Sequence, residues 1–335
     1  VNPLPEAPGQ LHLLSGVSRS FYLSVRLLPA PLRQPIAVAY LLARATDTVA
    51  DTAGLPLEQK LNTLQTMAAA IDGDTAAHPA LAGALASFAP NQQEPAEEAL
   101  LRSLPQCLIW LDELQAADRD DVRQVVRTIT GGQMLDVQRF DGGTGVRALA
   151  TADELRDYTW RVAGCVGEFW TQLGFRHLPG FASLPRGAML GLGKRYGMGL
   201  QLINILRDVE ADLAQGRCYL PADELAAAGL TPQQVACDPS LLEPVARRWR
   251  TEAGQLLDSG IEYAAALRNR RVRAASALPA LIGAPTLALL QTASRTQSTG
   301  KVKVSRGQVR VILAVLALTL AAPAPMRLLY HRLRA

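Results

Sequence analysis

The stretch that decides the fold reads Tyr40-Leu-Leu-Ala-Arg44-Ala-Thr-Asp47-Thr-Val-Ala-Asp51, and a second stretch reads Gln201-Leu-Ile-Asn204-Ile-Leu-Arg207-Asp208-Val-Glu-Ala-Asp212. Each contains two aspartates four residues apart in a largely apolar run. Residues four apart lie on the same face of an α-helix, so each pair would present both carboxylates on one side. The two stretches therefore predict two helices that each carry a pair of carboxylates.

The repeated acidic pair favours a metal site. Two like charges at this spacing repel each other, so a helix that keeps them needs a compensating cation. Mg²⁺ prefers oxygen ligands and leaves positions open for water and substrate phosphates. Arg44 lies three residues before Asp47 and Arg207 directly precedes Asp208, which suits a site that handles phosphate oxygens. Two such helices facing each other would form a clamp for a diphosphate.

The second stretch also carries a continuous polar line. Gln201, Asn204, Asp208 and Asp212 step by three, four and four residues between Leu, Ile and Val neighbours. This pattern predicts an ion site beside an apolar cavity. A solvated helix face would explain one acidic pair taken alone, but two pairs, each with an arginine and each within apolar sequence, favour a functional site.

Composition favours an all-α protein. The chain has 335 residues, of which 49% are hydrophobic, 19% charged and only 5% aromatic. Apolar residues recur at helical spacing in 57–71, 99–116 and 245–267, and long strand-like alternation is hard to find. The length by itself fits one large domain or two ordinary ones. The composition supplies enough Leu, Ala and Val for an extensive helical core.

Other sequence features narrow the class of protein. Four scattered cysteines and four scattered histidines predict neither a zinc site nor a disulfide framework, and a reducing compartment fits them best. The net charge of +4 permits acidic ligands or an anionic membrane surface, and no basic and aromatic pattern indicates nucleic acid. Residues 1–14 are expected to form a loose lead-in without a signal peptide. The apolar run 311–322 is too short to span a bilayer, so we expect a buried core helix, with a one-sided membrane contact as the alternative.

Breaks in the pattern set the expected elements. Pro29-Ala-Pro31 separates an organised segment over 11–28 from the first aspartate helix, which we expect from Ile36 to about Thr52. Two or three helices should follow over 57–114, and the second aspartate helix should occupy about 188–213. Thr231 and Pro232 are expected to start a short helix as N-cap and first helical residue.

Three further segments leave two interpretations each. Arg19, between Ser18 and Ser20, is either a surface arginine or a phosphate contact. Gly131 and Gly132 lie in a helical pattern, which indicates close approach of a ligand or of a neighbouring helix. Ala163, Gly164 and Gly167 would leave a groove either for a thin apolar ligand or for tight helix packing. Tyr158 nearby is either a proton donor or acceptor or a hydrogen-bonded core residue.

These ordered motifs resemble those of the squalene/phytoene synthase family, and most closely those of its squalene synthases. The resemblance rests on Ser18-Arg-Ser-Phe21, on the two aspartate stretches, and on Tyr158 followed by Val162-Ala-Gly-Cys-Val-Gly167. The final part of the chain adds Leu267-Arg-Asn269, Leu278-Pro279, Val302-Lys-Val-Ser-Arg-Gly-Gln308 and Tyr330-His-Arg332. Squalene synthases usually carry aromatic residues just before the equivalent of Leu278-Pro279, whereas this chain has Arg273-Ala-Ala-Ser276.

The resemblance implies one all-α isoprenoid-synthase domain over 15–335, with the aspartate helices facing each other across a central cavity. It implies condensation of two farnesyl diphosphates to presqualene diphosphate, followed by reduction with NADPH to squalene. The residues that would contribute are Asp47, Asp51, Asp208 and Asp212 for Mg²⁺ or Mn²⁺; Ser18, Arg19, Ser20, Tyr40, Arg44, Gln201, Asn204 and Arg207 for diphosphate; Tyr158 for proton removal; and Lys301, Lys303 and Arg306 for the NADPH phosphates.

The resemblance also sets expectations for the setting and leaves alternatives open. We expect a monomeric cytoplasmic enzyme that supplies hopanoid or sterol synthesis, with a peripheral contact to the inner face of the membrane for product release. A non-reductive relative would make dehydrosqualene, hydroxysqualene or phytoene instead. A non-catalytic member would bind prenyl chains or act in assembly, but the acidic pairs argue against that interpretation because a protein without catalysis has no need of their electrostatic cost.

Overall fold

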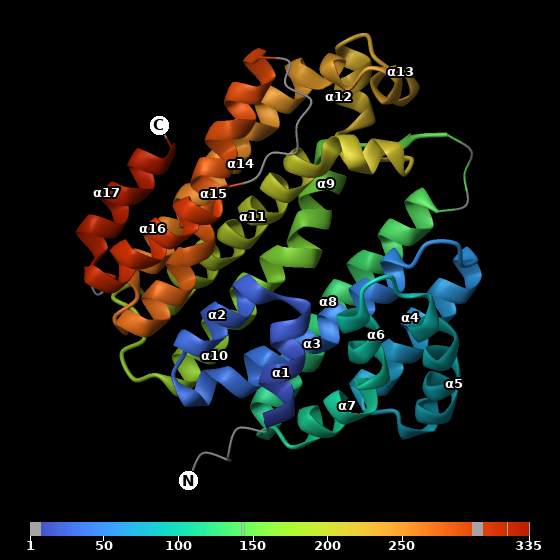
Figure 1. The fold of residues 1–335 in the computed structure, drawn as a ribbon, viewed down its shortest axis with the longest axis vertical. Helices are drawn as coiled ribbons and strands as arrows, with labels where there is room; N and C mark the ends of the chain where they lie inside the picture. Colours follow the sequence, from blue (N-terminus) through green and yellow to red (C-terminus); the bar gives the residue numbers. More distant parts are fainter. Residues whose placement is uncertain (1–7, 142, 144, 297–303, 320, 335) are drawn as a thin grey trace. The chain divides into compact units, whose positions relative to one another are not determined.

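The structure is a computed structural model that describes residues 8–141, 143, 145–296, 304–319 and 321–334 (Figure 1). The described residues are almost entirely helical, which confirms the all-α prediction. The chain divides into two compact units, Val1–Gly142 and Gly143–Ala335, and each is described by itself. The expectation of a single domain over 15–335 stays a prediction.

The first unit is a set of helices around α3. Ser18 separates the first two helices because its side chain accepts a hydrogen bond from the Phe21 amide and caps the second one. Four α-helices lie within 57–114, where two or three were expected, because the chain breaks again after α6 at Ser103. The elements are α1 (Pro8–Val17), α2 (Arg19–Leu27), α3 (Ala30–Asp51), α4 (Leu57–Asp72), η1 (Thr75–Ala77), α5 (His78–Phe88), η2 (Ala89–Asn91), α6 (Pro95–Arg102), α7 (Leu104–Asp112) and α8 (Ala116–Phe140).

The core of the first unit is built on α3, which packs against α4, α7 and α8. Its buried side chains include Val38, Leu41, Leu42, Ala45 and Val49, which recur at three- and four-residue spacing. Arg44, Asp47 and Asp51 of α3 are not among these buried residues.

The first aspartate helix begins earlier than the sequence analysis expected. It starts at Ala30 rather than at Ile36, with Pro31 in its first turn and Pro35 inside it. Pro31 is tolerated because the amides of the first turn have no partner within the helix in any case. The predicted break is present at Leu28 and Pro29, between the end of α2 and the start of α3, but Ala30 and Pro31 already belong to the first turn of α3.

The second unit is a helical bundle with α11 at its centre. Helix α11 packs against α10, α14 and α15, and α17 packs on α14 and α15. Its strands β1 and β2 form one short parallel pair, with Arg147 opposite Arg217. The elements are β1 (Arg147–Ala148), α9 (Ala152–Thr159), the π-helical turn η3 (Trp160–Gly164), α10 (Cys165–His177), α11 (Arg186–Ala214), β2 (Arg217–Cys218), α12 (Ala222–Ala227), α13 (Pro232–Cys237), η4 (Pro239–Leu242), α14 (Glu243–Ala266), α15 (Arg270–Thr296), α16 (Arg306–Leu318) and α17 (Pro323–Arg334).

Several predicted features of the second unit are confirmed. The second aspartate helix is α11, which begins at Arg186, two residues before the expected start at 188. Thr231 caps α13 and forms a capping box with Gln234, with Pro232 at the first helical position. Helix α15 is the one described helix long and apolar enough to cross a membrane, and 67% of its apolar window is buried inside the protein.

The expectation of a buried helix over 311–322 is wrong in part. Helix α16 buries Ile312 and Leu316, but Val311 and Leu318 are largely exposed. An apolar run does not say how many of its sides the rest of the chain covers, since that depends on packing.

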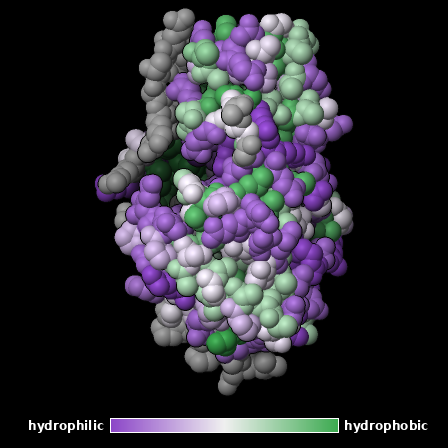
Figure 2. All heavy atoms as spheres, turned by 90° about the vertical axis from the view of Figure 1, so that its right-hand side faces the viewer, coloured by the Kyte–Doolittle hydropathy of each residue, from purple (hydrophilic) through white to green (hydrophobic). Residues whose placement is uncertain are grey.

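Figure 2 shows another face of the molecule, on which hydrophilic residues are interspersed with small apolar groups.

Candidate active site

The first acidic helix holds its arginine between two carboxylates. Arg44 donates from Nη1 to Asp47 Oδ2 at 2.5 Å, and its Nη2 donates to Glu97 Oε1 of α6. The two ion-pair contacts are half-buried, with 31% of the Arg44 side chain exposed. Because Glu97 anchors the other end of the guanidinium, Arg44 is fixed beside Asp47. Glu97 was not predicted from the sequence, because a Pro-Ala-Glu-Glu run is typical of an exposed helix start.

Helix α8 contributes a second partner to Asp47. Gln133 Nε2 donates to Asp47 Oδ1 at 3.5 Å, and only 7% of Gln133 is exposed. Its Oε1 is buried without a hydrogen-bond partner among the described residues. Asp136, one turn later, is also buried. A Cβ built on Gly131 would meet nothing within 4 Å, so close packing of a neighbouring helix does not explain that glycine.

The charge of Asp47 is unfavourable in the metal-free protein. Burial in the protein raises its pKa from 3.8 to about 6, with the nearby Asp51 carboxylate raising it further and Arg44 lowering it. The side chain nevertheless keeps 39% of its surface exposed. Asp51 is the last residue of α3 and is exposed. A carboxylate whose pKa is raised by desolvation and by a second carboxylate is suited to binding a cation.

Tyr40 lies one turn before Arg44 on α3. Its ring stacks on Phe21, with centroids 4.3 Å apart. Burial raises the pKa of Tyr40, and a hydrogen bond with the Ser18 side chain lowers it. The start of α2 is thereby connected to the acidic helix. The side chains of Arg19 and Ser20 lie outside the described part of the structure, so their predicted diphosphate contacts stay predictions.

The second acidic helix pairs its arginine with the adjacent aspartate. Arg207 Nε donates to Asp208 Oδ1 at 3.0 Å, and Nη2 donates to Oδ2, so both carboxylate oxygens are engaged. The side chains are 36% and 37% exposed. Gln201, Asn204 and Asp212 share this helix and none of them is buried, whereas Leu202, Ile203, Ile205 and Leu206 are buried. The predicted polar line on α11 is therefore present.

Close helix packing explains the glycines that follow Tyr158. A Cβ on Gly167 would lie 1.9 Å from the Gly193 carbonyl oxygen, and one on Gly197 would lie 2.1 Å from the Ala163 oxygen. Helix α11 thus fills the groove left by the small residues, which decides for tight packing. Tyr158 is buried and stacks on Tyr219 with centroids 5.0 Å apart. Its proposed role in proton removal stays a prediction.

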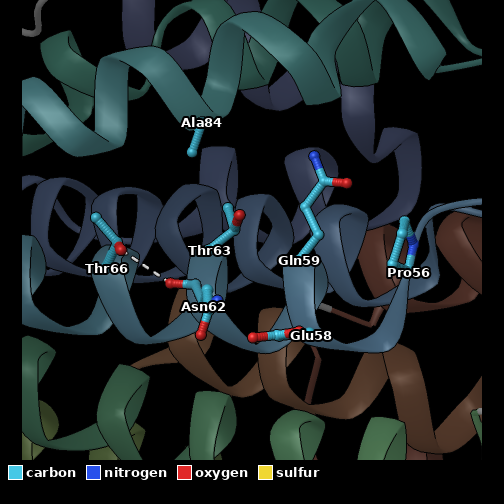
Figure 3. A pocket seen from close by; sticks show the side chains of 7 residues that line it. All are labelled: Pro56, Glu58, Gln59, Asn62, Thr63, Thr66 and Ala84. Carbon is cyan, nitrogen blue, oxygen red and sulfur yellow. Dashed lines mark hydrogen bonds between the residues drawn. The ribbon is translucent and has the colours of Figure 1, made fainter.

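The side chains predicted to bind the NADPH phosphates lie outside the part of the chain that the structure describes. Lys301 and Lys303 lie outside the described residues, as does the side chain of Arg306. A pocket of about 360 Å³ lies elsewhere, between α4 and α5, where Gln59, Asn62 and Thr66 line it (Figure 3). This pocket contains neither acidic pair. Within the described residues of the chain, no group of three or more His, Cys, Asp or Glu side chains is arranged around one point.

The sequence matches a family model described as "Squalene/phytoene synthase" over residues 14–308. The chain belongs to the squalene/phytoene synthase family. Both aspartate helices, Tyr158 and the glycine-rich packing of α10 on α11 lie inside the matched region. The prediction of this family from the ordered motifs is confirmed.

Relatives within the squalene/phytoene synthase family include two fungal proteins. The chain is 30% identical over 256 residues to a bifunctional lycopene cyclase/phytoene synthase of Arthroderma gypseum, and the match covers 74% of this chain and 40% of that protein. It is also 30% identical over 225 residues to a protein of the same name from Phaeosphaeria nodorum, covering 66% of this chain and 35% of the relative. The chain therefore spans less than half the length of these relatives.

Solved structures of family members share the fold. A complex of TcSQS with the ligand BPH1237 matches with a TM-score of 0.78 at 21% identity, covering 97% of this chain and 89% of that chain. A dehydrosqualene synthase complex matches with a TM-score of 0.64 at 21% identity, covering 95% and 99%. The squalene synthase HpnC from Alicyclobacillus acidocaldarius gives 0.55 at 20% identity, covering 86% and 94%. At these identities the likeness shows the fold, an all-α isoprenoid synthase fold.

Proposed function

We propose that the chain is a magnesium-dependent squalene synthase, which condenses two farnesyl diphosphates to presqualene diphosphate and reduces this product to squalene with NADPH. One observation carries the proposal. Each of two family-matched helices has an aspartate pair whose first member is ion-paired to an arginine from the same helix. A site for the ionisation of an allylic diphosphate requires both carboxylates for a metal and arginines for phosphate oxygens.

The residues of the first acidic helix fit a divalent cation. Asp47 and Asp51 repel each other and burial further disfavours the charge of Asp47, and a cation would remove both penalties. The buried Gln133 Oε1 supplies an additional unpaired oxygen beside Asp47. In the proposal, Asp47 and Asp51 on α3 and Asp208 and Asp212 on α11 hold the magnesium ions. Bound magnesium would supply charge neutralisation for the departing diphosphate.

The side chains around the metal ligands would bind and orient the substrates. Arg44 and Arg207 would turn part of their donors from aspartate to diphosphate oxygens, since a guanidinium can bridge both. Ser18, Tyr40, Gln201 and Asn204 would add hydrogen bonds to the same group. The surrounding Leu and Ile side chains would exclude water from the allylic cation. Tyr158 would accept the proton whose removal closes the cyclopropane ring.

A phytoene-type product is the second candidate. The two fungal relatives at 30% identity are bifunctional lycopene cyclase/phytoene synthases. The segment 273–276, where squalene synthases usually carry aromatic residues, holds only a buried arginine, two alanines and a serine. Both observations favour a reaction that ends before the reduction or that starts from the longer geranylgeranyl diphosphate.

A product assay distinguishes the two candidates. The protein is incubated with Mg²⁺ and either farnesyl or geranylgeranyl diphosphate, with and without NADPH, and the extracted lipids are analysed by mass spectrometry. Squalene that forms only with farnesyl diphosphate and NADPH supports the first proposal. Phytoene from the C20 substrate without reductant supports the second. Formation of no condensed product from either substrate would contradict both, and would favour a prenyl-binding or assembly protein.

We also propose that the enzyme works in the cytoplasm and releases its product at a membrane, in hopanoid or sterol supply. Squalene and phytoene are both hydrocarbons with negligible solubility in water, so a bilayer is the natural acceptor for either. Recovery of the protein in cell fractions, with and without added salt, tests the location. A protein found wholly in a secreted fraction would contradict it.

A further inference from the structure

Helix α16 ends in an apolar segment, 311–318, that the described residues bury on one side only. The segment 311–318 reads Val-Ile-Leu-Ala-Val-Leu-Ala-Leu, with no polar residue. Ile312 and Leu316 are buried against the rest of the unit, where α16 packs on α15. A helix that is hydrophobic all round is normally buried all round, either in protein or in lipid. The residues that the structure describes therefore leave the outer side of α16 without the cover that its composition predicts.

The uncovered side forms a continuous apolar ridge. Val311, Ala314 and Leu318 are all exposed and lie at positions i, i+3 and i+7, which places them along one face. Leu318 is 85% exposed and Val311 is 58% exposed. The ridge lies on the opposite face of the helix from Ile312 and Leu316, because these residues are about half a turn away. We call Val311, Ala314 and Leu318 the α16 ridge.

The part of the chain that contains α16 is strongly basic. Residues 263–335 contain 12 of the 34 basic side chains and none of the 30 acidic ones. The preceding 262 residues carry 22 basic and 30 acidic side chains, a net charge of −8. Arg310 on α16 and Arg332 on α17 are exposed and form no ion pair with a described residue. Arg327 and Arg334 pair with Glu262 and Asp258, and Arg273 is buried. The exposed Arg310 and Arg332 remain available to an anionic partner.

We propose that α16 is an interfacial helix that docks this chain on an anionic lipid surface. The α16 ridge enters the boundary between headgroups and acyl chains, and the exposed Arg310 and Arg332 contact the lipid headgroups. An interfacial helix needs an apolar face to bury and basic residues for anionic lipids, and α16 together with this segment supplies both. The inference stands on exposure and charge alone, so it does not depend on the product that the enzyme makes.

A second copy of the chain and a nucleic acid fit the same surface less well. An isologous dimer through α16 would bring two strongly basic segments together, and like charges repel. Three exposed side chains also form a much smaller patch than the roughly 800 Å² per partner of a stable interface. A nucleic acid would satisfy the positive charge but would leave the α16 ridge in water. Lipid is the partner that satisfies both properties.

Sedimentation with vesicles tests the proposal on the full chain. Large vesicles of phosphatidylcholine with 30 mol% phosphatidylglycerol are compared with pure phosphatidylcholine, each at low and high salt. We expect binding to the anionic vesicles that weakens with salt. The double variant V311S/L318S should lower the partition coefficient about tenfold or more, because both side chains lose their apolar burial. Circular dichroism checks that the variant stays folded.

A matched control makes the same hydrophobic-to-serine substitutions on a different part of the surface. The double variant I109S/L184S removes two exposed hydrophobic side chains, 50% and 40% exposed, from α7 and from the segment before α11. It should bind vesicles as the unaltered chain does. Equal loss in both double variants would contradict the proposal, as would an unaltered chain that stays in the supernatant with anionic vesicles. Binding to a DNA duplex that competes fully with vesicles and is insensitive to V311S/L318S would identify a polyanion surface instead.

A fluorescent dye on α16 gives a second readout, which reports insertion into the vesicle directly and does not require a variant with weakened vesicle binding. Cys237 is the exposed cysteine and the other three are buried, so the C237S variant provides a background for labelling L318C with an environment-sensitive dye. We expect a blue shift of the dye when anionic vesicles are added, and none for the same dye on I109C. No shift at position 318 while the protein sediments with vesicles would show that another surface makes the contact, and would overturn the assignment.

Discussion

The two acidic helices carry the same motif in different electrostatic settings. On α3, Arg44 is shared between Asp47 and the distant Glu97, and Gln133 of α8 donates to the same aspartate. On α11, Arg207 engages both oxygens of the adjacent Asp208. The exposed fractions of the two first aspartates are nearly equal, 39% and 37%. The difference therefore lies in the partners, and not in access to water.

This difference indicates that the two helices would respond differently when substrate and metal arrive. The α3 aspartate accepts hydrogen bonds from Arg44 of its own helix and from Gln133 of α8, and Glu97 of α6 anchors Arg44, so we expect its position to be set before any ligand binds. The α11 aspartate is paired only with its neighbour among the contacts described above, and a cation can take its oxygens once Arg207 turns away. A repeated sequence motif thus gives one preorganised carboxylate and one that exchanges its partner.

The largest expected effect is on turnover. Asp47→Asn and Asp208→Asn should each lower diphosphate release by about a thousandfold or more, because loss of one metal-binding carboxylate removes charge stabilisation from the leaving group. Pyrophosphate release with farnesyl diphosphate measures this. Asp120→Asn, an exposed position of α8, is the control and should be neutral. Full turnover in either site variant would show that its aspartate is not needed for diphosphate release.

Glu97→Gln tests whether turnover depends on the ion pair that anchors Arg44 to α6. Removing the charge that anchors Arg44 should lower kcat about tenfold, since a hydrogen bond to a charged group contributes about 1.5–3 kcal/mol. Glu98→Gln is a close control, because Glu98 is the next residue of α6 and pairs only with Arg102 on the surface. Equal activity of the two variants would mean that Glu97 does not position Arg44.

The raised pKa of Asp47 predicts a pH dependence of stability in the metal-free protein. Its pKa is about 6 in the folded chain against 3.8 in the unfolded one, so the unfolded state loses its proton first as the pH rises. Stability is therefore lost between about pH 4 and pH 6. Asp47→Asn should raise the unfolding free energy at pH 7 by about 1 kcal/mol, after allowance for the exposed part of the side chain, and leave it unchanged below pH 4.

Thermal unfolding in the presence of a chelator measures that effect at both pH values. Adding Mg²⁺ should cancel the benefit of the substitution, because the cation binds the ionised carboxylate. An Asp47→Asn variant less stable than the unaltered chain at pH 7 would show that Arg44 and Gln133 already compensate the charge. In that case the two helices would differ less than the contacts suggest.

The smallest expected effect concerns the exchange of partners on α11. Arg207→Gln removes the competitor for both oxygens of Asp208, so Mg²⁺ should bind about threefold more tightly in the absence of substrate. Isothermal titration of the substrate-free protein measures the dissociation constant. Turnover should fall at the same time, because Arg207 no longer contacts diphosphate. Weaker magnesium binding by this variant would mean that Arg207 orients Asp208 instead of competing for it.

Features that depend on residues close together in the sequence could be predicted from the sequence. The i, i+4 aspartates, the Thr231 cap and the apolar runs each depend on residues within one or two helical turns, and the structure contains them. The position of Pro31 was misread because a proline can begin a helix as well as break a chain. The exposure of α16 was misread because an apolar run has the same sequence whether one side or all sides are covered.

The sequence by itself determined the helical class, the family, and the acidic residues around which the chemistry is proposed. Only the tertiary structure decided that Glu97, 53 residues from Arg44, and Gln133, 86 residues from Asp47, meet the first acidic helix. It also decided the raised pKa of Asp47 and the uncovered ridge of α16. The physical reason is that helix formation depends on neighbours in the chain, whereas desolvation and ion pairing depend on which distant segments pack together.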